Sequence, residues 1–154
     1  MTTPEQRLEA LGIALPTPAK PVANYLGYMQ AGSLVFTAGQ LPYVDSKVLH
    51  VGLHGDGVSK DDGKVAARHA AINVLAQVKA ACGGDLSRVK RVVKLTGFVA
   101  CVGSFTDHPF VVNGASDLMV EVFGEAGRHA RSAVGVSSLP LNSCVEIEGI
   151  FEIA

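Results

Sequence analysis

The chain ends in RSAVGVSSLPLNSCVEIEGIFEIA, residues 131–154, and this stretch decides the fold. It holds two runs that are rich in strand-forming residues, 131–138 and 144–153. Between them, the sequence Leu-Pro-Leu-Asn at 139–142 has the composition of a turn. We therefore expect two strands joined as a β-hairpin at the end of the chain.

Charged residues stand at unusual places in both of these strands. Side chains alternate between the two faces of a strand, so Arg131 shares a face with Ala133 and Gly135. These small neighbours leave room beside the guanidinium, whose fork can donate two parallel hydrogen bonds to a carboxylate. In the second run, one face is expected to carry Glu146, Glu148, Ile150 and Glu152. The alternation alone fits a solvated sheet face and a functional site equally well.

The rest of the chain alternates between helical and strand patterns. Helical patterns cover 4–13, 59–84 and 108–124, and strand patterns cover 89–102 and a hairpin in 25–42. The middle helix has the clearest limits, with Ser59 and Asp62 at capping-box spacing and Gly83-Gly84 at its end. This order predicts an α+β sandwich: one mixed β-sheet with two main helices packed on one face, plus a short N-terminal helix.

Length and composition indicate a soluble single domain. At 154 residues the chain fits one domain, 1–154, in which 1–23 form an N-terminal extension made of a short helix and a proline-rich loop. No apolar run approaches the ~20 residues of a membrane span, and the mixed start MTTPEQRLEALGI resembles no targeting peptide. We therefore expect a cytoplasmic protein with no membrane partner. The formal net charge of -1 argues against nucleic acid as a partner.

Histidine and cysteine spacing predicts no metal site. His50 and His54 lie in a glycine-rich loop, where their spacing does not bring the side chains together. Cys82, Cys101 and Cys144 follow no metal or redox spacing, so free thiols in a reducing compartment are expected. The sequence contains no phosphate-binding loop, dinucleotide fingerprint or nucleophile elbow.

Three segments together resemble the Rid family, also called YjgF, of reactive-intermediate deaminases. The first is NYLGYMQAGSLVFTAGQLP, residues 24–42, an aromatic residue followed by a hairpin that ends in Gly-Gln. The second is FTDHPFVVNGASDLMVEVFG, residues 105–124, with an asparagine early in its helix. The third is 131–153, with an arginine, a short strand, Leu-Pro and a Glu-x-Glu strand. The resemblance covers 24–154 in family order and is loose at 43–57.

This resemblance implies a fold, an assembly and a reaction. The fold would be the chorismate-mutase-like α+β sandwich, assembled as a homotrimer with active sites in clefts between subunits. The reaction would be hydrolysis of enamine and imine intermediates, such as 2-aminoacrylate and 2-iminopropanoate, to 2-keto acids and ammonia. The partner is then a small imino or keto acid, and the family needs no cofactor and no metal.

The resemblance also assigns roles to individual residues. The carboxylate-binding arginine of the family falls on Arg131 and its water-handling glutamate on Glu146. Its aromatic hydroxyl falls on Tyr25 and its helix asparagine, a substrate-binding position, on Asn113. The chemistry suits these residue types, because a guanidinium can anchor the substrate carboxylate and a buried glutamate can act as a general base.

At two further substrate-binding positions the chain departs from the family pattern. The serine that often precedes Gly-Gln is Ala38 here, which removes a hydroxyl that could contact the ligand. The cysteine two places after the arginine is Ala133, which keeps the backbone N–H that this position often contributes. These two departures therefore bear more on which substrate the protein prefers than on whether it is active.

Other functions remain open at this stage. A non-catalytic trimer that binds small carboxylates would use Arg131 equally well but would not need Glu146. Ribonuclease activity, a label that some family members carry, fits poorly with the near-neutral charge and with the lack of a paired histidine acid–base motif. Chorismate mutase activity would rest on fold analogy alone.

Overall fold

The computed structural model describes residues 1–18 and 20–154, so Ala19 of the expected N-terminal loop lies outside the described residues. The main elements are α1 (Pro4–Ala10), β1 (Tyr28–Ala31), β2 (Leu34–Thr37), α2 (Lys60–Ala81), β7 (Val89–Ala100), α3 (His108–Phe123), β8 (Ala130–Val136) and β9 (Val145–Ile153). Two short ladders lie between β2 and α2: β3 (Tyr43–Val44) with β4 (Lys47–Val48), and β5 (Leu53–His54) with β6 (Gly57–Val58). The chain also contains three short 3-10 helices among its described residues: η1 (Leu86–Arg88), η2 (Gly124–Gly127) and η3 (Pro140–Asn142).

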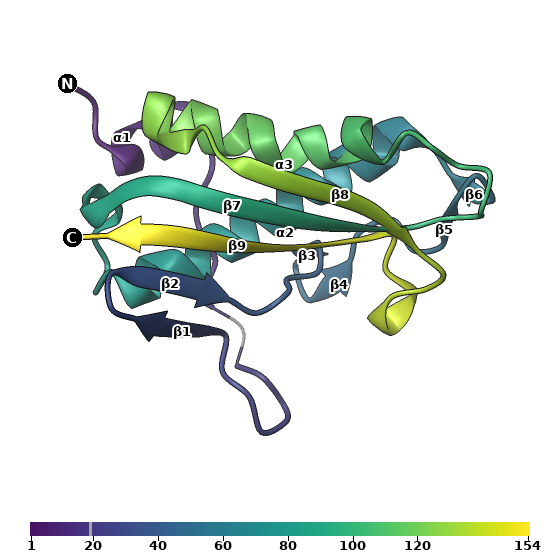
Figure 1. Cartoon of the computed structure of the whole chain (residues 1–154), viewed down its shortest axis with the longest axis horizontal. Helices are drawn as coiled ribbons and strands as arrows, with labels where there is room; N and C mark the ends of the chain where they lie inside the picture. The colour runs from purple at the N-terminus through teal and green to yellow at the C-terminus, as the bar shows by residue number, and fades with distance from the viewer. Residues whose placement is uncertain (19) are drawn as a thin grey trace.

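The five long strands form one mixed sheet in the order β1-β2-β9-β7-β8 (Figure 1). Helices α2 and α3 lie together on one side of this sheet, and α1 lies near one end of α3. The expected α+β sandwich with two main helices on one face and a short N-terminal helix is therefore confirmed. No helix in the described part of the chain is long and apolar enough to cross a membrane.

The expectation that the last two strands form a hairpin is wrong. Strands β8 and β9 each pair with β7, β8 in parallel and β9 antiparallel, so β7 separates them. The reason is the order β7-α3-β8: a helical crossover returns the chain parallel to the strand it left. One edge of β7 is thereby taken by β8, and β9 pairs along the other edge, where it also meets β2.

The two main helices begin and approach each other as their sequences favour. The Ser59 hydroxyl accepts a hydrogen bond from the Asp62 N–H at 3.1 Å and caps α2. At the α2–α3 contact, a Cβ on Gly114 would overlap the Lys64 carbonyl oxygen, so glycine is needed for the backbones to come this close. Gly124, with φ of 63°, ends α3 in the left-handed region that glycine tolerates.

The two faces of the sheet differ in what covers them. On the helix face, β9 contributes the buried residues Val145, Ile147, Gly149, Phe151 and Ile153, which confirms the alternation seen in the sequence. No helix of residues 1–18 and 20–154 covers the other face, which is only partly buried; we call it the open face. Its apolar members include Met29 and Phe36, which are 62% and 40% exposed. This uncovered face holds the expected Glu146, Glu148, Ile150 and Glu152.

Candidate functional site

The predicted site residues fall into two groups on opposite faces of the sheet. Arg131 and Asn113 meet on the helix face, at the edge formed by β8. Glu146 lies on the open face, on β9. The strand register establishes this, because Arg131 is paired with the buried Leu95 whereas Glu146 is paired with the half-buried Phe98. Leu95 and Phe98 are an odd number of positions apart on β7 and so point to opposite faces.

Arg131 is held at the sheet edge by helix α3. Its Nη1 donates to Asn113 Oδ1 at 2.7 Å and to Ser116 Oγ at 3.3 Å. Asn113 and Ser116 are three residues apart on α3, so they lie on the same side of the helix. The Nε–H and Nη2–H donors have no partner among residues 1–18 and 20–154. These donors form the fork that binds a carboxylate through two hydrogen bonds.

Ala133 lies on the same face of β8 as Arg131 and is half-buried. The Cys101 N–H donates to the Val136 carbonyl at 3.1 Å, so the backbone of Val136 faces β7. Backbone groups alternate along a strand, and those of Ala133 and Arg131 therefore face the free edge of the sheet. The room that was expected along this face is partly filled, because the space over Gly135 is taken by His108 and Cys101.

Glu146 packs against the backbone of Gly39. A Cβ on Gly39 would overlap the Glu146 carboxylate, so any larger residue here would displace that side chain from its present position. The approach is fixed by a pair of backbone hydrogen bonds between Gln40 and Ile147, at 2.8 and 3.1 Å. Burial raises the pKa of Glu146, and the neighbouring carboxylate of Glu148 raises it further. A glutamate with a raised pKa is suited to take up and release a proton during catalysis.

Tyr25 and Ala38 lie on the segments that flank β1 and β2. Tyr25 is 58% exposed and its hydroxyl has no hydrogen-bond partner in the described chain. The Ala38 N–H donates to the Gly27 carbonyl at 2.9 Å, and its own carbonyl accepts from Gln40 Nε2 at 3.2 Å. The backbone of Ala38 is therefore already engaged, and only its small side chain remains to shape a site.

One chain does not bring Arg131 and Glu146 to the same ligand. They are separated by two strand spacings across the sheet and by three positions along β7. With about 4.8 Å between strands and about 3.3 Å per residue, their Cα atoms lie roughly 14 Å apart. Because the two side chains also leave opposite faces, a small substrate cannot touch both within one copy.

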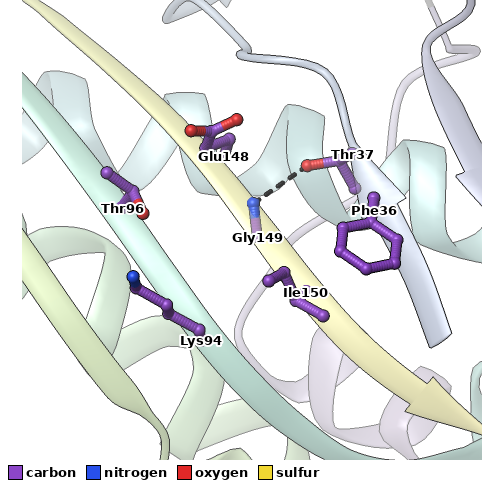
Figure 2. Close-up of a pocket in the computed structure, with 7 residues that line it drawn as sticks. All are labelled: Phe36, Thr37, Lys94, Thr96, Glu148, Gly149 and Ile150. Carbon is purple, nitrogen blue, oxygen red and sulfur yellow. Dashed lines mark hydrogen bonds between the residues drawn. The ribbon is translucent and has the colours of Figure 1, made fainter.

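The open face is hollowed beside the glutamates. A hollow of about 280 Å³ is lined by Phe36, Thr37, Lys94, Thr96, Glu148, Gly149 and Ile150 (Figure 2). The Gly149 N–H donates to Thr37 Oγ1 at 3.0 Å and helps to form its floor. Lys94 has no ion-pair partner in the part of the chain that is described. None of the residues predicted to act on a substrate lines this hollow.

Sequence reasoning missed three residues of these groups: Ser116, His129 and Gly39. Ser116 could have been found from its helical spacing to Asn113, and His129 from its position two residues before Arg131, on the same face of an extended strand. Gly39 follows Ala38, which the family resemblance placed in the site. The contact of Gly39 with Glu146 could not be predicted, because it depends on the pairing of distant segments. Within the described residues, no group of three His, Cys, Asp or Glu side chains could hold a metal ion.

Comparison with known proteins connects this geometry to one family. Residues 5–152 match the family model described as "YjgF/chorismate mutase-like, putative endoribonuclease". Protein TCP17 of Trypanosoma cruzi is 47% identical over 95% of this chain and 91% of its own length. A 2-iminobutanoate/2-iminopropanoate deaminase of Dermatophagoides farinae is 29% identical over 92% of this chain and 94% of its own length.

Solved structures show the same fold at two levels of similarity. The protein Atu1372 of Agrobacterium tumefaciens, described as of unknown function, has a TM-score of 0.92 at 48% identity and covers 98% of this chain and 92% of its own. The YjgF gene product of E. coli has a TM-score of 0.61 at 28% identity, over 88% of this chain and 93% of its own. The similarity to Atu1372 is therefore much closer in both sequence and shape.

Proposed function

The chain belongs to the YjgF/chorismate mutase-like family, and we propose that it hydrolyses enamine and imine intermediates to 2-keto acids and ammonia. The substrates would be small 2-imino acids such as 2-iminopropanoate. The observation that supports this most directly is Arg131, whose guanidinium is fixed through one nitrogen while its carboxylate-binding fork stays open. The deaminase among the relatives supports the same reaction class.

Arg131 would bind the carboxylate of the substrate. Asn113 and Ser116 occupy Nη1, so the open fork of Nε–H and Nη2–H is already oriented when the ligand arrives. Such preorganisation lowers the entropy cost of holding the substrate for attack. The outward-facing N–H of Ala133 is a further donor beside this anchor.

Glu146 would act as the general base and then as the general acid. Its carboxylate takes a proton from water while the oxygen of that water bonds to the carbon of the protonated imine, which gives a neutral carbinolamine. The protonated Glu146 then gives this proton to the carbinolamine nitrogen. The C–N bond breaks and ammonia leaves, while the carboxylate accepts the proton of the carbinolamine hydroxyl so that the C=O bond of the keto acid forms; ammonia takes up that proton and is released as ammonium. A raised pKa suits both steps, because the group must gain and lose a proton in one cycle. The Tyr25 hydroxyl would donate a hydrogen bond to the ligand.

The active site would be assembled from two copies of the chain. Arg131 of one copy and Glu146 of the next would face the same ligand, because one copy holds them on opposite faces. The open face supports such an assembly, since Met29 and Phe36 expose apolar surface there. A head-to-tail contact forms a closed ring when the rotation between copies returns to the first copy, and we propose the homotrimer that the family resemblance implies.

The endoribonuclease named in the family description is a weaker candidate for this chain. The formal net charge is -1, with 13 Lys and Arg against 14 Asp and Glu, whereas binding of the phosphate backbone needs an excess of basic side chains.

The three cysteines are free, which suits a reducing compartment such as the cytoplasm.

The test uses 2-aminoacrylate generated in situ by a serine dehydratase, with semicarbazide to trap the surviving imine. The wild-type protein should accelerate keto-acid release and reduce the trapped fraction. Arg131→Ala should lower kcat/KM by about 100-fold or more, since it removes charge-assisted hydrogen bonds to the substrate. The control is Arg128→Ala, because the Arg128 side chain is exposed and, among the described residues, contacts only the Glu125 carboxylate, at 3.2 Å.

Two results would contradict the proposal. Full activity in Arg131→Ala would show that Arg131 does not bind the substrate carboxylate. No activity in the wild type towards small or bulky imino acids, together with carboxylate binding that does not depend on Glu146, would instead support a binding protein.

A further inference from the structure

We propose that Ser116 and His129 are positioning residues for Arg131, and that they hold its fork in the orientation that binds a 2-imino or 2-keto acid carboxylate. This inference rests on the proposed function and extends it to two residues that do not touch the substrate. Both lie on the helix side of the β8 edge, Ser116 on α3 and His129 immediately before β8. Both are half-buried, as Arg131 is.

The three side chains form one line of hydrogen bonds. His129 Nδ1 lies 2.6 Å from the Gly127 carbonyl oxygen, which can only accept, so Nδ1 carries the proton. In the neutral ring Nε2 is then an acceptor, and it lies 2.9 Å from Ser116 Oγ. The Ser116 hydroxyl therefore donates its only proton to His129. Its lone pairs remain to accept from Arg131 Nη1 at 3.3 Å.

The donor-to-acceptor direction of these hydrogen bonds determines whether Ser116 can accept from Arg131. A serine hydroxyl on a helix can otherwise rotate and donate to a backbone carbonyl of the preceding turn. The acceptor nitrogen of His129 fixes the hydroxyl so that an oxygen lone pair faces Arg131. Together with Asn113 Oδ1 at 2.7 Å, this oxygen engages both hydrogens of Nη1 and stops rotation of the guanidinium.

His129 is itself fixed by the backbone of η2. A Cβ on Gly127 would overlap the Met119 carbonyl oxygen, so this turn packs directly on α3. Helix α3 thus carries Asn113 and Ser116 and also supports the turn that orients His129. One end of the line of hydrogen bonds therefore lies on α3, and the other lies on a turn that packs against α3.

The pattern of used and unused donors indicates a ligand site. The acceptor and donor positions of the neutral His129 ring are both used, and so are both hydrogens of Arg131 Nη1. The Nε–H and Nη2–H groups of Arg131 have no partner in the described residues. An arginine with a purely structural role would direct this fork into the chain. Here the hydrogen bonds within the chain use only Nη1. The Nε–H and Nη2–H edge, which can bind a carboxylate, stays open.

The test measures pyruvate binding by calorimetry and 2-iminopropanoate turnover in four variants of the full chain. Ser116→Ala and His129→Phe should each raise the pyruvate Kd and the KM about tenfold, with kcat nearly unchanged. Ser116→Thr keeps the hydroxyl and should bind like the wild type. The control is Ser104→Ala, at an exposed position in the loop before α3.

The outcomes separate this inference from the proposed function. If pyruvate binding weakens in Ser116→Ala and is restored in Ser116→Thr but no protein turns over imine, the positioning role stands and the deaminase proposal fails. If turnover depends on Arg131 while Ser116→Ala and His129→Phe bind pyruvate like the wild type, the positioning role is wrong. Absence of pyruvate binding in the wild type would overturn it as well.

Discussion

Arg131 and Glu146 project from opposite faces of a single sheet, and β7 lies between the strands that carry them. The cation is held on the helix side by Asn113, and the carboxylate packs on the open side against Gly39. Each group is positioned by its own supports. The proposed chemistry therefore depends on how copies of the chain meet as much as on how one copy folds.

Gly39→Ala should impair turnover more than ligand binding. The added Cβ would overlap the Glu146 carboxylate and displace the proposed base, while Arg131 on the other face keeps its contacts. A misplaced general base costs on the order of 100-fold in kcat. Steady-state kinetics on 2-iminopropanoate and pyruvate calorimetry would measure the two effects separately.

The matched control for this change is Gly103→Ala, because a Cβ there would meet nothing within 4 Å. It should leave both kcat and the pyruvate Kd unchanged. Wild-type kcat in Gly39→Ala would show that the position of Glu146 is not critical.

Glu146→Gln should abolish turnover and also stabilise the fold at neutral pH. Burial raises the pKa of Glu146 above its unfolded value, so the folded chain disfavours the charged carboxylate. Stability from this group is present at low pH, where it is protonated in both states, and is lost as pH rises through the folded pKa. Thermal unfolding should show a higher Tm for the variant at about pH 7 and a smaller gap at about pH 4. A lower Tm at neutral pH would contradict this account.

Glu148→Gln should shift the pH dependence of the reaction. As a base, Glu146 must be ionised, so activity should fall as pH drops through its raised pKa. Removal of the Glu148 charge takes away one cause of that rise, and the acidic limb of the kcat profile should move to lower pH. Burial remains the larger cause, so the shift is partial. An unmoved acidic limb would mean that another group controls the profile.

His54 should make the fold sensitive to mild acid. Its ring is fully buried, with Nδ1 3.0 Å from the Ala100 carbonyl oxygen and no partner for Nε2 in the described chain. Burial lowers the pKa of His54 from 6.5, so the unfolded chain takes up a proton first and the free energy of unfolding falls as pH drops below 6.5. In His54→Gln this slope should be shallower in urea titrations from about pH 7 to about pH 5. An unchanged slope would mean that a group other than His54 causes the loss of stability in mild acid.

Local patterns were enough to predict the long helices and strands and the faces of β9, but not the short strands β3 to β6. Alternation placed Glu146 and Glu148 opposite the buried Ile147, and Ser59 correctly marked the start of α2. These features depend on neighbours in the sequence, where side-chain direction follows from the period of a strand or helix.

The sheet order and the division of the site could not be predicted in the same way. Whether Arg131 and Glu146 share a face depends on their registers against β7, which the chain sets only when distant segments pair. The predicted final hairpin failed for the same reason, since the turn at 139–142 says nothing about a strand inserted between β8 and β9.

Subunit mixing tests the central claim that Arg131 and Glu146 act from different copies. Arg131→Ala and Glu146→Gln, each inactive alone, would be unfolded together in equal amounts and refolded. If every site takes its arginine from one copy and its glutamate from the next, about a quarter of the sites in a random mixture regain both groups. The account predicts recovery of about this fraction of wild-type activity. A mixture as inactive as its two components would contradict it.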